Sequence, residues 1–176
     1  MASLLAIERY LPPFRYHQTV VTEWVKAWHT EDGRHDSARL LSVYAASGVK
    51  SLASVVPIEE VFLPKDFETQ NDRYREIAIA AGTDVAGRAL TASGLAPSDI
   101  ALVVSVSCTG FMIPAVDAYV ADALGLGPRL VRIPITESGC AGGVVGLARA
   151  VDFLSAHPEQ AALVLALEFA SLTFQR

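Results

Sequence analysis

The sequence reads Thr136-Glu137-Ser138-Gly139-Cys140-Ala141-Gly142-Gly143 where an apolar run, residues 130–135, gives way to a stretch of helical periodicity. The run is expected to be a buried strand, and residues 140–156 are expected to form a helix. Its predicted core positions recur at helical spacing, at Val144, Leu147, Val151 and Leu154. The rest of this helix is rich in Gly and Ala, which predicts close packing on all sides.

Cys140 is therefore predicted at a corner between a strand and a helix. Unpaired N–H groups and the positive end of the helix dipole meet there, and both favour a thiolate, the nucleophilic form of cysteine. Gly139, Gly142 and Gly143 permit a tight turn and leave room for a substrate near the sulfur. The alternative is that Cys140 is a small buried hydrophobic residue, as most free cysteines are.

Composition narrows the class of protein. The chain has 176 residues, of which 52% are hydrophobic and 19% charged, enough for one compact domain over residues 1–176. Its net charge of −5 argues against nucleic-acid binding and against an anionic membrane surface. Two cysteines make no disulfide framework, so a cytoplasmic protein is expected. No apolar run is expected to span a bilayer.

Helices and strands alternate from residue 71 onward. A long helix over residues 71–93 precedes a Val-rich strand over 100–106, and a helix over 115–124 leads to the strand before Cys140. A third strand is expected over 161–168. This order predicts an α/β fold with a mostly parallel sheet covered by helices. Upstream, helices are expected over residues 18–30 and 37–46, with extended chain between 49 and 57.

Three loops leave the carboxyl ends of these strands, at residues 107–114, 136–140 and 169–175. Ligands of open α/β sheets bind at that edge. Cys140, Cys108, Thr109 and Thr173 are therefore expected to share one site.

Other common sites do not fit the sequence. The glycines around Cys140 do not follow the dinucleotide-binding pattern, and Ser138 lacks the glycines of a serine nucleophile elbow. No metal is expected, because the histidines are scattered and the cysteines are not at zinc-finger spacing. The four histidines are His17, His29, His35 and His157, and none of them falls at a predicted strand end near Cys140. The nucleophile is therefore expected to lack its usual partners within this chain.

Two motifs carry a resemblance to a known family. Ser105-Val106-Ser107-Cys108-Thr109-Gly110-Phe111-Met112-Ile113-Pro114, followed by the Cys140 segment, resembles the type III polyketide synthases, the chalcone and stilbene synthase family, and above all their bacterial branch. Residues 57–60 and 168–175 also match. The resemblance implies the N-terminal half of a thiolase-like αβαβα fold. It also implies an acyltransferase that condenses an acyl-CoA starter with malonyl-CoA through a cysteine thioester.

The same resemblance implies a role for each matching residue. Cys140 is similar to the acylated nucleophile, and Glu168 to a buried carboxylate that supports the site. Cys108, Thr109 and Thr173 match residues that line the pocket. Two alternatives stay open: Cys108 could be an ordinary core residue, and the Thr173 hydroxyl could be an ordinary feature of a strand exit. Ile113 matches a residue that reaches into the partner of a homodimer, so a homodimer through residues 107–114 is expected. The substrates are CoA thioesters, and no cofactor is expected.

The sequence departs from the family in two ways. The His and Asn that assist decarboxylation belong to a C-terminal half that follows residue 176 in the family, so the chain is expected to be catalytically incomplete. Leu52 stands where many members carry an Arg near the CoA phosphates, and Lys50 is the candidate substitute.

Three alternatives remain beside this reading. The first is a condensing enzyme similar to ketoacyl synthase III of fatty-acid synthesis, against which the 108–114 loop argues. The second is a half-domain that acts only by association with another chain, since it would expose apolar surface and sheet edges. The third is a redox-sensing pair of Cys108 and Cys140.

Overall fold

The protein is described by a computed structural model over residues 2–31 and 37–174. His35, which the sequence places in a loop, lies outside the described residues. The chain divides into two compact units. The first comprises residues 1–10 and 71–168, and the second comprises residues 11–70 and 169–176.

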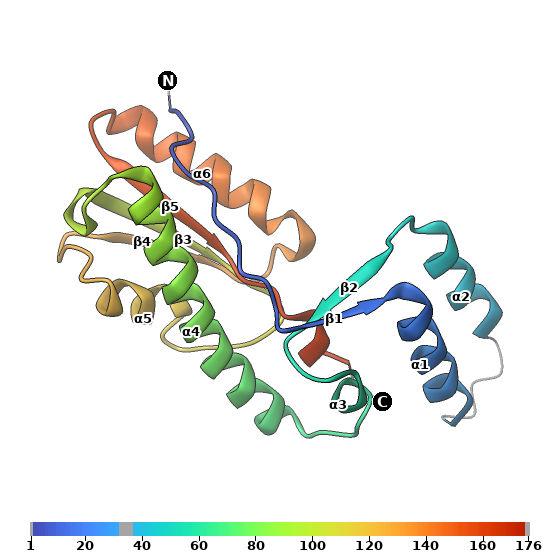
Figure 1. The fold of residues 1–176 in the computed structure, drawn as a ribbon. Helices are drawn as coiled ribbons and strands as arrows, with labels where there is room; N and C mark the ends of the chain where they lie inside the picture. Colours follow the sequence, from blue (N-terminus) through green and yellow to red (C-terminus); the bar gives the residue numbers. More distant parts are fainter. Residues whose placement is uncertain (1, 32–36, 175–176) are drawn as a thin grey trace. The chain divides into compact units, whose positions relative to one another are not determined.

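The first unit is built on a parallel sheet of three strands (Figure 1). Strand β3 (Ile100–Val106) lies at its centre, between β4 (Val131–Ile135) and β5 (Ala161–Ala166). Leu102, Val103 and Val104 have no exposed surface, as expected for a strand covered on both faces. The parallel sheet predicted from the apolar runs is confirmed.

Helices cover both faces of this sheet (Figure 1). On one face, α6 (Gly142–Ala156) packs against Leu102, Val104 and Val106 through Ala150. The other face carries α4 (Phe67–Ser93) and α5 (Val116–Ala123). Gly82 of α4 allows a close approach to α5 and to the residue after β5, since a Cβ there would lie 3.2 Å from Val120 and 3.1 Å from Leu167. The helix-covered α/β architecture is therefore the predicted one.

The sequence assigned the wrong face of α6 to the core. Val144, Leu147 and Val151 are 73%, 52% and 50% exposed. The face on the sheet is instead the small-residue face, which holds Gly142, Gly146 and Ala150. A Cβ on Gly146 would lie 3.1 Å from Val106, so larger side chains on this face would push the helix off the sheet.

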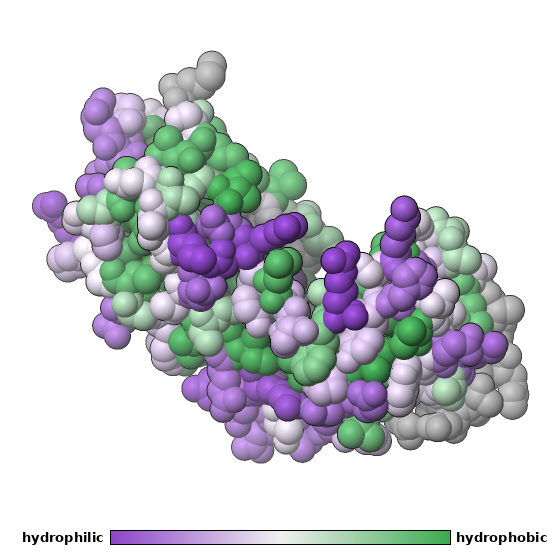
Figure 2. Space-filling model, viewed as in Figure 1, coloured by the Kyte–Doolittle hydropathy of each residue, from purple (hydrophilic) through white to green (hydrophobic). Residues whose placement is uncertain are grey.

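The segment Gly139–Ala156 is an exception to the expectation that no apolar run could span a bilayer. By length and composition it could cross a membrane, and 17% of it is buried. This is weak evidence for a span, because the core helix of a soluble protein has the same composition. Figure 2 shows hydrophobic surface where α6 and the N-terminal segment lie in Figure 1, and both carry exposed apolar side chains.

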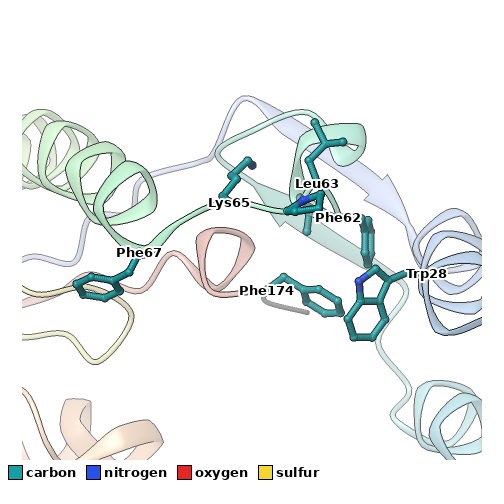
Figure 3. A pocket seen from close by; sticks show the side chains of 8 residues that line it. Trp28, Phe62, Leu63, Lys65, Phe67 and Phe174 are labelled. Atoms are coloured by element: carbon teal, nitrogen blue, oxygen red, sulfur yellow. The ribbon is translucent and has the colours of Figure 1, made fainter. Parts of the chain in front are cut away.

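The second unit joins a two-stranded antiparallel sheet to helices. Strand β1 (Phe14–His17) pairs antiparallel with β2 (Ser51–Ser54), and the helices are α1 (Gln18–Glu31), α2 (Ser37–Ala46) and α3 (Ile58–Val61). Its core is aromatic: the rings of Trp28 and Phe62 each meet Phe174 at a centroid distance of 4.8 Å. These rings line a cavity of about 320 Å³ with Lys65 at its edge (Figure 3).

Candidate active site

Main-chain hydrogen bonds join the three chain segments that follow β3, β4 and β5, at the carboxyl ends of these strands. The N–H of Ser107 donates to the carbonyl of Ile135 at 3.1 Å, which ties the exit of β3 to the exit of β4. The N–H of Leu167 donates to the carbonyl of Val106 at 2.9 Å, which ties β5 to β3. The residues that follow each strand are thereby collected at one edge of the sheet, as the topology predicts.

Cys140 lies in a single 3-10 turn, Gly139–Ala141, between the exit of β4 and the start of α6. Its side chain is exposed, so the alternative of a buried core cysteine is wrong. Gly139 has a φ of +51°, a conformation that glycine adopts without steric cost. The expected corner is therefore present, although the helix itself begins two residues after the cysteine.

The other two glycines of the corner differ in their surroundings. A Cβ on Gly142 would lie 2.5 Å from Cγ1 of Val106, so glycine is needed there for contact between helix and sheet rather than to admit a substrate. Gly143 has no atom within 4 Å of such a Cβ and faces open space.

Glu168 holds the loop after β3. Its carboxylate accepts the N–H of Cys108 at 2.9 Å and the hydroxyl of Thr109 at 2.7 Å. Cys108 is exposed, so the reading of this residue as core is also wrong. Glu168 was expected to be a buried carboxylate, but it is exposed in this chain. The structure thus brings Cys108, Thr109 and Glu168 together.

The local electrostatics act on the Cys108 thiol. Partial loss of hydration raises its pKa, and the negative charge of Glu168 raises it further. Cys140 and Glu137 act in the same direction, so the loops after β3 and β4 share one electrostatic environment. At neutral pH these influences keep Cys108 in its thiol form.

The replacement Glu168→Gln is expected to shift the alkylation of Cys108 to lower pH. Removing the carboxylate charge lowers the pKa of the thiol, so more thiolate is present at a given pH, while the amide oxygen still accepts the N–H of Cys108. Rates of iodoacetamide modification at Cys108, measured by peptide mass spectrometry across pH, test this. Glu137→Gln is the matched control and should give a smaller shift. An equal shift in both variants, or a shift to higher pH, would contradict the conclusion that the charge of Glu168 raises the pKa of Cys108 more than Glu137 does.

Two predicted site residues belong to the second unit. Thr173 is exposed, and its hydroxyl donates to the carbonyl of Ala170 at 2.9 Å. Lys50 is exposed beside β2, and its carbonyl accepts the N–H of Gln18 at 3.0 Å. The place of Thr173 in one site with Cys140, and the contact of Lys50 with the CoA phosphates, stay predictions. Ile113, in the first unit, is 83% exposed.

Sequence reasoning missed several polar side chains around the 107–115 loop. Asp117, at the start of α5, is 1% exposed, accepts the hydroxyl of Ser105 at 3.0 Å and pairs with Arg132 at 3.5 Å. Asn71 and Tyr74 of α4 contact the loop directly. Among the described residues, no group of three or more His, Cys, Asp or Glu side chains could hold a metal ion.

Comparison with known proteins places this arrangement in a family. Residues 2–176 match the profile of the N-terminal domain of chalcone and stilbene synthases. The 1,3,6,8-tetrahydroxynaphthalene synthase of Streptomyces peucetius is 36% identical over 99% of this chain and 46% of its own length. The phloroglucinol synthase of Pseudomonas fluorescens is 31% identical over 94% of this chain and 48% of its own length.

A solved structure extends the likeness to three dimensions. The crystal structure of the tetrahydroxynaphthalene synthase of Streptomyces coelicolor, a bacterial type III polyketide synthase, superimposes with a TM-score of 0.87 at 34% identity. The match covers 94% of this chain and 47% of that one. The predicted thiolase-like fold is confirmed for an N-terminal portion, and the chain spans about half the length of the relatives it matches.

Proposed function

The chain belongs to the chalcone and stilbene synthase family and corresponds to its N-terminal domain, and from that premise we propose that it is the N-terminal part of a type III polyketide synthase. The observation that carries this proposal is the exposed Cys140 at the exit of β4, beside the exit of β3 where Glu168 holds Cys108 and Thr109. The proposed substrates are an acyl-CoA starter and malonyl-CoA. No cofactor is needed for this chemistry.

The first step of the proposed reaction is acyl transfer to Cys140. Its thiolate attacks the carbonyl carbon of the acyl-CoA thioester, a new thioester forms on the protein, and CoA leaves as a thiolate that takes up a proton. Malonyl-CoA then loses CO₂, and the carbanion left behind attacks the Cys140 thioester. A carbon–carbon bond forms, and the Cys140 thiolate is released for another cycle.

The chain supplies only some of the groups that this reaction needs. An oxyanion must be stabilised in both steps, usually by donors aimed at the developing charge. The resemblance assigns that task to a His and an Asn of the C-terminal half. Lys50 and Thr173 are proposed as contacts for the CoA phosphates and the pocket, and Glu168 as the carboxylate that fixes the loop carrying Cys108 and Thr109.

Incubation of this chain alone with acyl-CoA and malonyl-CoA is expected to give slow acylation and no polyketide. Cys140 is the proposed nucleophile, and the resemblance assigns the groups that stabilise the oxyanion and assist decarboxylation to the C-terminal half of the family. Intact-protein mass spectrometry measures the acyl adduct, and chromatography of the small molecules detects any product. Full polyketide turnover by this chain would contradict the proposal that the C-terminal half supplies the groups for oxyanion stabilisation and decarboxylation.

A second candidate function is activity through association with another chain, which the apolar face of α6 favours. Val144, Leu147 and Val151 are at least half exposed. Exposed apolar side chains grouped on one face of a helix are typical of a surface that contacts another protein. A homodimer through residues 107–114 is proposed as well, because the Ile113 side chain projects from this loop at 83% exposure. Size-exclusion chromatography of the same preparation tests association, and a clean monomer would contradict both contacts.

A further inference from the structure

The loop at residues 107–115 carries Cys108, Thr109 and Ile113, yet it has no regular secondary structure of its own. Its first residues are held from one side by Glu168. From the other side, the loop is held by two side chains of α4 that no motif of the sequence singles out for a role at the site.

Asn71 pairs with both main-chain groups of Phe111. The N–H of Phe111 donates to Oδ1 of Asn71 at 2.7 Å, and Nδ2 of Asn71 donates to the carbonyl of Phe111 at 2.9 Å. A side-chain amide offers an acceptor and a donor together, so it can take the place of a neighbouring strand for this one residue. Alanine would lose both bonds.

Tyr74 lies one helical turn after Asn71, on the same face of α4. Its ring lies against Gly110, where a Cβ would come within 2.0 Å of the ring carbon Cγ. Its hydroxyl donates to the hydroxyl of Ser107 at 2.7 Å, and the N–H of Ser107 is bonded to β4. Tyr74 is 2% exposed, and its pKa is raised by burial and by the charges of Glu168 and Cys108.

These contacts follow one another along the loop without a gap. Ser107 and Gly110 meet Tyr74, Phe111 meets Asn71, and Glu168 binds the two residues between Ser107 and Gly110. Ile113 lies two residues beyond the last of these contacts and is 83% exposed. The loop is thus fixed as far as Phe111, and the fixed part determines where Ile113 starts.

We infer that Asn71 and Tyr74 are positioning residues, which hold Cys108 and Thr109 against Glu168 and set the base from which Ile113 projects. The meaning of this position for catalysis rests on the proposed function, because that function assigns Cys108, Thr109 and Ile113 to the wall of the substrate cavity. The contacts themselves can be tested without any acyl substrate.

The test compares the two thiols within one molecule. Cys108 and Cys140 are alkylated with iodoacetamide at one neutral pH, and peptide mass spectrometry gives the ratio of their rates in the wild type, Asn71→Ala and Tyr74→Phe. Releasing the loop moves Cys108 away from Glu168, so its thiolate fraction rises, and Cys140, which lies on another loop, is the internal reference. Asn71→Ala should raise the ratio by about threefold, because the Cys108 thiol is released from the charge of Glu168.

Tyr74→Phe keeps the ring beneath Gly110 and loses only the bond to Ser107, so its increase should be smaller. Asp72→Ala is the matched control, since Asp72 adjoins Asn71 but, among the described residues, pairs with Arg75 alone, and its ratio should equal that of the wild type. An unchanged or lowered ratio in Asn71→Ala would overturn the inference. So would equal acceleration of both thiols, which would indicate general loosening. Failure of acyl-CoA to label Cys140 would count against the proposed function and leave this ratio unaffected.

Discussion

Replacing Cys140 by serine is expected to abolish acylation of the chain by acyl-CoA. A serine hydroxyl is almost wholly protonated at neutral pH and attacks a thioester only when a base removes its proton. The residues that flank position 140 in the chain, from Ser138 to Gly143, carry no titratable group that could act as this base. Loss of an essential nucleophile lowers rates by several orders of magnitude, so a fall of about 10³-fold or more is expected.

Intact-protein mass spectrometry of the acyl adduct over time provides the measurement. Ser155→Ala is a suitable control, because Ser155 lies near the far end of α6 and its hydroxyl donates to the carbonyl of Val151 within the same helix. Its adduct should form at the rate of the wild type. Adduct formation by Cys140→Ser at an undiminished rate would show that another group takes the acyl chain.

Replacing Gly110 by alanine is expected to lower the free energy of unfolding by about 3 kcal/mol, near the upper end for overpacking a core position. The added Cβ would come within 2.0 to 2.4 Å of three ring carbons of Tyr74. This ring cannot turn aside easily, because Tyr74 is buried and its hydroxyl is bonded to Ser107. Either the loop or α4 must therefore move.

Urea denaturation followed by circular dichroism measures this change. Gly127→Ala is the matched control, since a Cβ there has no atom within 4 Å and its φ is not positive. It should alter the free energy of unfolding by less than about 0.5 kcal/mol, as surface substitutions usually do. A similar small effect for Gly110→Ala would contradict the packing described for the loop.

The strands and the parallel sheet could be predicted because short apolar runs between turn residues are typical of buried strands. Residues 100–106 were expected as a strand and form β3 with the same bounds. Helix starts were harder: α4 was expected from residue 71 but begins at Phe67. Asp66 caps it by accepting the N–H of Thr69 at 2.7 Å, which also lowers the pKa of Asp66. This polar stretch resembled a connector in sequence.

The face of α6 could not be predicted from periodicity, since both of its faces are free of charge near Cys140. Close contact with the sheet selected Gly142 and Gly146 over the larger Val144 and Leu147. A hydrophobic stripe indicates that a face is apolar, and it does not say which neighbour covers it.

The site residues were predicted where they belong to a motif and were missed where the contacting side chain lies outside any motif. Cys108, Thr109 and Glu168 were expected from the resemblance, and the structure brings them together. Asn71 binds the main chain of a residue 40 positions away, and a main-chain contact leaves no signature in the residue it binds. Tyr74 is buried on α4, but its bond to Ser107 follows only from the fold.

The central claim is that the sulfur of Cys140 receives the acyl group. Peptide mapping by tandem mass spectrometry, after exposure of the chain to an isotopically labelled acyl-CoA, tests it most directly. The label should be found on the peptide that contains Cys140, with the peptide of Cys108, which is also exposed, remaining unlabelled. A label on Cys108, or one divided evenly between the two thiols, would contradict the account.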